Sequence, residues 1–83
     1  MFSLFRRKPS PYAVAIRDSL RDAPHLWFCS GSNVFWSLAM PGEYIRIDGR
    51  YRFRWWTPRA DRRVIREGIE AWIAWSLTRK ETT

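Results

Sequence analysis

The chain has 83 residues, and its 15 lysines and arginines against eight aspartates and glutamates give a formal net charge of +7 at pH 7. It is 46% hydrophobic and contains six Trp, three Tyr and five Phe, which excludes a disordered chain because disorder goes with low hydrophobicity and few aromatic residues. A chain of this length holds one small domain. The composition therefore predicts a small, folded, basic and aromatic-rich binding protein.

The chain has too few cysteines and histidines for a disulfide or a structural zinc site. Cys29 is the only cysteine and His25 the only histidine, so the chain can form neither an internal disulfide nor a closed zinc site. A lone cysteine is typical of the reducing cytoplasm. We therefore expect a cytoplasmic protein that uses no metal and no other cofactor.

Residues 1–9 predict an N-terminal arm that is apolar and then basic. Phe2, Leu4 and Phe5 precede the basic run 6–8, the reverse of the charge order in a secretory signal peptide. No apolar run in the sequence approaches the ~20 residues of a transmembrane helix. Residues 2–8 could at most make weak peripheral contact with an anionic membrane.

A first helix is predicted to begin at Ser10 and Pro11, because serine caps a helix and proline fits its first turn. Pro24 disfavours helical geometry at the residue before it, so this helix ends by about residue 22. Its apolar positions share one face: Tyr12, Ala13, Ile16 and Leu20.

The next stretch predicts a β-hairpin, in which residues 25–30 and 34–38 flank a turn that begins with Gly31. A two-residue loop at Gly31 and Ser32 gives two pairs, Trp27 with Trp36 and Phe28 with Phe35. One side then has Leu26, Phe28 and Phe35, and the other has Trp27, Cys29, Val34 and Trp36. Since both sides are apolar, either both are covered or one is a binding face.

Residues 44–47 and 51–56 predict a second hairpin. A three-residue loop of 48–50, with Gly49 at positive φ, keeps apolar and charged side chains on separate faces, whereas a two-residue loop mixes them. This register pairs Ile47 with Tyr51 and Ile45 with Phe53. The predicted core side has Ile45, Ile47, Tyr51, Phe53 and Trp55, and the opposite side has Tyr44, Arg46, Arg52 and Arg54.

Thr57 and Pro58 predict the start of a second helix, with Asp61 near the positive end of the helix dipole. Its apolar stripe consists of Ile65, Ile69, Trp72, Ile73 and Leu77, widened by Val64 and Trp75. On its polar side, two pairs have the i,i+4 spacing of ion pairs: Arg63 with Glu67 and Arg66 with Glu70.

Together these elements predict an α+β fold in a single small domain of residues 10–79, followed by a frayed tail of residues 80–83. The expected order is α-β-β-β-β-α. Because sequential strands usually pair and each amphipathic helix must bury its stripe, we expect a four-stranded antiparallel meander with the two helices on one face. The other face of the sheet is then left uncovered.

The second hairpin is unusually basic. Arg46 and Arg52 are expected directly opposite each other on the outer face, which is unfavourable for like charges, with Arg54 and Arg50 close by. The only local acids are Glu43 and Asp48. This pattern favours an anionic partner, either a phosphate or an acidic protein surface. The alternative is a solvated face whose guanidiniums stack on Tyr44 and Trp56.

Three of the tryptophans, Trp27, Trp36 and Trp56, are expected on or near the uncovered face, whereas Trp55 and Trp72 are expected in the core. Tryptophan and arginine are the residue types enriched at the energetic centres of interfaces. The alternatives are that another part of the chain covers these rings or that they form a dimer seam.

Catalysis has little support in the sequence. His25 and Cys29 would share one face of a strand but lie about 13 Å apart, too far for proton transfer. The sequence contains neither G-x-G-x-x-G nor a P-loop for phosphate binding. We therefore expect no enzymatic activity.

These features favour a non-catalytic protein that docks an Arg- and Trp-rich sheet face onto an acidic surface of a larger protein and blocks or regulates it. Its size and composition are typical of small accessory or inhibitor proteins of phages and mobile elements. The expected partner-binding residues are Arg46, Arg50, Arg52, Arg54, Tyr44, Trp27, Trp36 and Trp56. Two alternatives stay open: nucleic-acid binding through the same face, where aromatic rings stack on bases, and a homo-oligomeric structural subunit.

Overall fold

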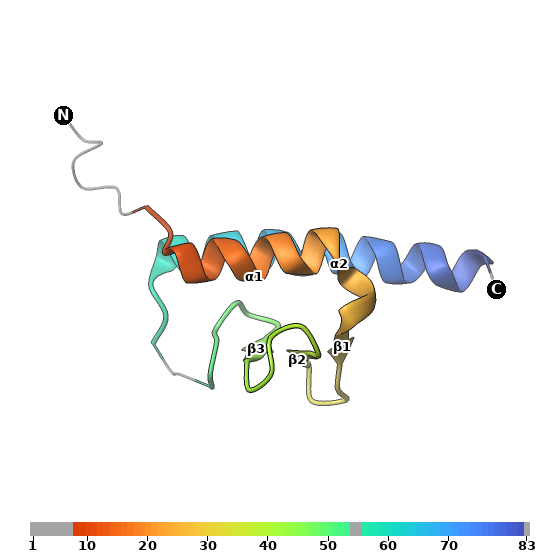
Figure 1. Cartoon of the computed structure of the whole chain (residues 1–83), viewed down its shortest axis with the longest axis horizontal. Helices are drawn as coiled ribbons and strands as arrows, with labels where there is room; N and C mark the ends of the chain where they lie inside the picture. The colour runs from red at the N-terminus through yellow and green to blue at the C-terminus, as the bar shows by residue number, and fades with distance from the viewer. Residues whose placement is uncertain (1–7, 54–55, 83) are drawn as a thin grey trace.

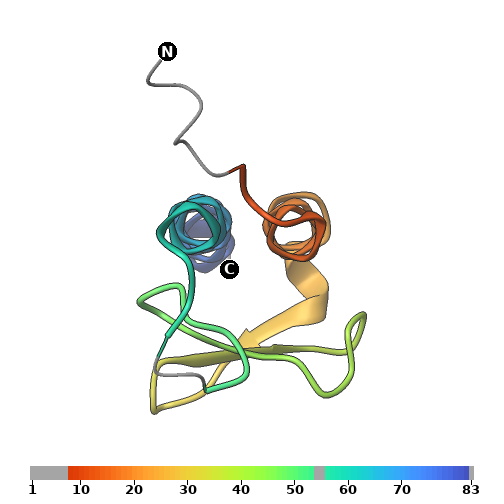
Figure 2. The ribbon, with the colours of Figure 1, turned by 90° about the vertical axis from the view of Figure 1, so that its left-hand side faces the viewer.

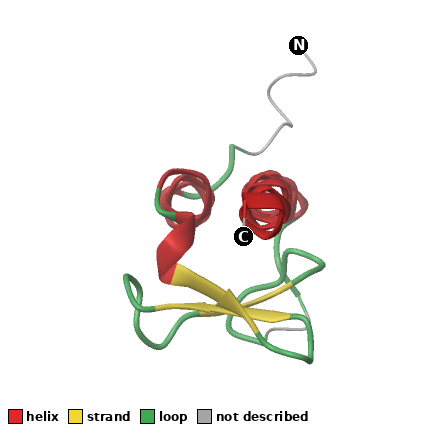
Figure 3. Cartoon of the chain, turned by 90° about the vertical axis from the view of Figure 1, so that its right-hand side faces the viewer, coloured by secondary structure: helices red, strands yellow, loops and turns green. Residues whose placement is uncertain are grey.

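A computed structural model of the chain describes residues 8–53 and 56–82. It is a two-layer α+β domain, in which two helices lie side by side on one face of an antiparallel sheet (Figures 2 and 3). The elements in chain order are α1 (Pro11–Asp22), the 3-10 helix η2 (Pro24–Leu26), β1 (Trp27–Cys29), β2 (Val34–Ser37), β3 (Tyr44–Arg46) and α2 (Arg59–Thr82). Both helices start at the same end of the molecule and run in the same direction (Figure 1).

Helix α1 begins and ends where the sequence predicts. The Ser10 hydroxyl accepts a hydrogen bond from the Ala13 N–H at 3.1 Å, and Pro11 occupies the first helical position. At the other end, the Ala23 N–H donates to the Ser19 carbonyl at 2.9 Å. The helix buries Ala13, Ile16 and Leu20 against the rest of the core.

The first hairpin differs from the prediction by one residue of register. Its pairs are Phe28 with Trp36 and Cys29 with Phe35. The loop has three residues because Asn33 adopts a left-handed φ of 63°, and its N–H donates to the Ser30 carbonyl at 3.0 Å. A one-residue slip turns a strand over, so the predicted placement of Trp27 on the outer side and of Phe28 and Phe35 together on the other is wrong.

The second hairpin also has a three-residue loop, and Gly49 has the predicted positive φ, at 90°. The loop nevertheless consists of residues 47–49, since the Arg46 N–H donates to the Arg50 carbonyl at 2.7 Å. Ile45 therefore pairs with Tyr51 and not with Phe53.

The predicted fourth strand is reduced to that single bridge at Tyr51. Arg52 and Phe53 follow with left-handed φ values of 56° and 55°, far from strand geometry, and strand pairing ends there. Within the described residues the sheet has three strands in the order β1-β2-β3. Ile47 and Phe53 are exposed, and their predicted place in the core is wrong. Arg54 and Trp55 lie outside the described residues.

The core lies between the helix pair and the inner face of the sheet, and its largest members are two aromatic side chains that face the helices, Trp27 and Phe35. The Trp27 indole N–H donates to the Ser19 hydroxyl at 2.8 Å. Trp72 packs edge-on against Phe35, and its N–H lies 3.0 Å from the Pro24 carbonyl. Both indole donors are thus satisfied.

A buried carboxylate fixes the starts of the two helices together. Asp61 accepts hydrogen bonds from the Ser10 N–H at 2.8 Å, the Ser10 hydroxyl at 2.9 Å and the Tyr51 hydroxyl at 3.2 Å. The acid predicted near the α2 dipole thus joins α1, α2 and the second hairpin.

Further along, α1 and α2 touch closely at Gly68. A Cβ built there would lie 2.8 Å from the Arg17 Cα. Beyond this contact α2 continues past the end of α1 (Figure 1). Leu77, predicted to belong to the apolar stripe, is 55% exposed, and the helix reaches Thr82, within the stretch 80–83 that was expected to fray.

Candidate binding surface

The outer face of the sheet, away from both helices, bears a row of aromatic side chains. Phe28 pairs with Trp36, and Trp36 pairs with Tyr44, so the three residues lie side by side across β1, β2 and β3. They are 39%, 38% and 42% exposed, respectively. We call these three residues the aromatic row.

Contacts between the rings fix their orientation. The Phe28 and Trp36 ring centroids are 4.7 Å apart with an interplanar angle of 26°, which is a stacked pair. Tyr44 in turn contacts Phe53, with centroids 5.2 Å apart. The left-handed backbone that ends the predicted fourth strand thus leaves Phe53 exposed beside the aromatic row.

Arg52 does not lie opposite Arg46, as the sequence suggested, and it is held by an acid. Its Nη2 donates to Glu43 Oε1 at 3.0 Å and its Nε to the same oxygen at 3.2 Å. This hydrogen bond raises the pKa of the Arg52 guanidinium above its usual value. The guanidinium also lies 5.5 Å from the ring centroid of Tyr12.

Asp48 forms ion pairs with two further arginines. Its Oδ2 lies 3.5 Å from Arg50 Nε and 3.9 Å from Arg46 Nε. The repulsion expected among these arginines is therefore reduced by acids within the same hairpin. The outer face presents aromatic surface with cations that already have partners.

The predicted tryptophans are divided between two environments. Trp36 lies on the outer face, as expected, but Trp27 is buried in the core. Trp56 is exposed and lies outside the strands. Phe28 and Phe53, which the sequence assigned to the covered side, are on the surface instead. Asn33 was the sequence signal that indicated the exposure of Phe28. Asparagine tolerates the left-handed position that closes a three-residue loop, and a loop of that length sets the register that places Phe28 on the outer face.

The residues weighed for catalysis are not assembled into a site. His25 lies in η2 and Cys29 in β1, both exposed. Partial burial raises the pKa of the Cys29 thiol, which disfavours the nucleophilic thiolate. Within residues 8–53 and 56–82, no three His, Cys, Asp or Glu side chains are grouped so as to hold a metal ion.

No family model, no curated protein and no solved structure matches the chain. None of the helices in the described part is both long and apolar enough to cross a membrane.

Proposed function

We propose that this is a non-catalytic binding protein that docks the outer face of its sheet onto an acidic surface of a larger protein, and so blocks or regulates it. The observation that supports this most directly is the aromatic row. Trp and Tyr are enriched where interfaces derive most of their binding energy, and here both lie in a row that the chain's own helices leave open.

Ring orientation favours a protein partner over nucleobases on this face. A base stacks on the free face of an aromatic ring. Phe28 and Trp36 stack on each other, so one face of each ring is already occupied, and Tyr44 contacts Phe53. Together these rings form a continuous apolar surface, which suits the side chains of a protein.

Arg46 and Arg52 supply the charge complementarity in this proposal. The ion pair of Arg46 with Asp48 is at the surface, where such a pair contributes little stability and can exchange for an acid of a partner. Arg52 keeps its bond to Glu43, whose side chain is only 11% exposed, and offers a side chain that is itself 55% exposed. Charge at the rim of an interface mainly speeds association and selects the partner. The proposal takes the protein to act in the cytoplasm, in keeping with its single cysteine.

Photo-crosslinking in extracts of the source cell tests the proposal. One variant replaces Trp36 with benzoylphenylalanine, and a control places the same residue at Ala15, which is exposed on α1. We expect a discrete heavier band from position 36 and none from position 15. A product of twice the 10.0 kDa chain mass would instead indicate a homodimer seam. Equal or absent products from both positions would contradict the proposal.

A further inference from the structure

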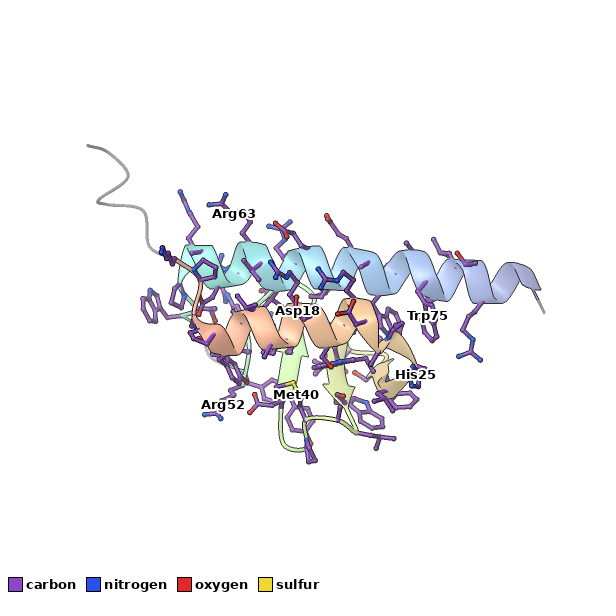
Figure 4. All side chains as sticks on the ribbon, turned by 45° about the horizontal axis from the view of Figure 1, so that its top comes forward. Asp18, His25, Met40, Arg52, Arg63 and Trp75 are labelled. Carbon is purple, nitrogen blue, oxygen red and sulfur yellow. The ribbon has the colours of Figure 1, made fainter. Side chains whose placement is uncertain are left out.

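A second group of cations lies on α2, in the helix layer of the domain. Its members share one side of the first two turns: Arg59, Arg62, Arg63 and Arg66. Arg62 is half-buried and the other three are exposed. We call these four residues the α2 arginine face. The Arg63 side chain points away from the sheet (Figure 4).

These arginines lack the acid partners that the described arginines of α1 and of the second hairpin have. The ion pairs predicted from spacing, Arg63 with Glu67 and Arg66 with Glu70, are not formed. Among the described residues, no acid lies within 4.0 Å of any member of the face. Arg62 Nε is moreover buried without a hydrogen-bond partner.

Their position on the helix is also unfavourable for folding. The first turn of a helix has the positive end of its dipole, so Arg59 and Arg62 there destabilise it. Asp61 is the acid of the first turn, but its oxygens accept from Ser10 and Tyr51 inside the core. A local feature that opposes the fold in this way is typical of a functional surface.

Shape and spacing match a chain of phosphates. The four arginines line a hollow of about 370 Å³ that is bounded at one end by Glu67 and Glu70. Arg59 and Arg66 are separated by about 10 Å along the helix, which is long enough to reach neighbouring phosphates of one nucleic-acid strand. The planar guanidinium fork pairs with phosphate oxygens through two hydrogen bonds at once.

We propose that the α2 arginine face binds the phosphate backbone of a nucleic acid, without reading its sequence. An anionic membrane fits this face less well, because a helix lying on lipid needs apolar side chains beside its cations. Here Glu67 and Glu70 follow the arginines, and Leu77 lies about 16 Å further along the axis. This binding is separate from docking through the aromatic row, and the two proposals can fail independently.

Fluorescence anisotropy with a labelled 20-base-pair DNA duplex, titrated between 50 and 300 mM salt, tests the proposal. The test variant is Arg59→Gln with Arg63→Gln. A matched control, Arg21→Gln with Arg79→Gln, removes the same charge from α1 and from the far end of α2. We expect the test variant to bind about tenfold more weakly at low salt, with the slope of log K against log salt smaller by about 1.8. The control should keep most of the wild-type slope and affinity.

Three results would overturn the proposal. The first is no binding of the duplex by the wild type at 50 mM salt. The second is an equal loss in the test and control variants, since that would reflect net charge alone. The third is tighter wild-type binding to phosphatidylserine vesicles or to polyglutamate than to the duplex. Circular dichroism verifies the folding of each variant. If the double test variant is unfolded, the single variant Arg63→Gln is measured in its place.

Discussion

The two halves of α2 differ in what surrounds them. The N-terminal half is enclosed by α1 and the second hairpin, where it buries Ile65 and Asp61 and touches α1 at Gly68. The C-terminal half begins with Trp72, which still packs on Phe35, and then extends past α1, where Leu77 is largely in water. A single uninterrupted helix thus has a structural part and a free end, and the apolar spacing of its sequence does not distinguish them.

The largest stability loss is expected from Ile65→Ala in the enclosed half. Ile65 is fully buried in the core, so its truncation removes apolar contacts and leaves a cavity. We expect the free energy of unfolding to fall by about 3–4 kcal/mol. Urea unfolding followed by Trp fluorescence measures this, and a loss below about 1 kcal/mol would contradict the enclosed packing.

Asp61→Ala should have the next largest effect. It leaves the Ser10 N–H, the Ser10 hydroxyl and the Tyr51 hydroxyl without their common acceptor. We expect a loss of about 2–3 kcal/mol in the same urea assay, because unsatisfied buried donors are costly. The matched change Asp22→Ala, at an exposed acid of α1, should leave the unfolding midpoint near that of the wild type.

Gly68→Ala tests the close contact between the helices. Alanine normally stabilises a helix relative to glycine, but here the added Cβ would lie 2.8 Å from the Arg17 Cα. We expect a net loss of about 1–2 kcal/mol, since the helices must move apart. Gly31→Ala, where nothing lies within 4 Å of the added atom, is the control. A stabilised Gly68→Ala variant would show that the helices are not in contact there.

Leu77→Ala should have the smallest effect. The side chain is exposed beyond the core, so we expect a change within about 0.5 kcal/mol. Comparison with Ile65→Ala in the same assay then separates the two halves of α2. A loss as large as that of Ile65→Ala would mean that something covers Leu77 in solution.

The helices could be predicted from sequence because their signals are local, but only α1 has the predicted cap. The Thr57 hydroxyl, expected at the start of α2, is buried without a hydrogen-bond partner, and α2 begins at Arg59. Ser10 and Pro11 start α1, and a buried face of period 3.6 follows. The strands could not be placed as well, because their faces depend on loop length. In the first hairpin Asn33 took the left-handed position that was not anticipated, and the whole outer face changed with it.

The candidate site was found in part for the same reason. Trp36 and Tyr44 were placed on the outer face correctly, but the register error put Trp27 on that face in place of Phe28. The prediction for the second hairpin was wrong for another reason. No local rule predicts left-handed backbone at Arg52 and Phe53, neither of which is glycine.

The common direction of α1 and α2 has a consequence for the order of folding. Two helices that run the same way cannot close as a local hairpin, and contacts such as Ser10 with Asp61 join residues 51 positions apart. Bringing the two helices together costs the entropy of closing that long loop before their contacts can stabilise the fold. The short hairpins of the sheet should therefore form earlier. We therefore expect Gly68→Ala to unfold faster than the wild type in stopped-flow measurements while refolding at nearly the same rate.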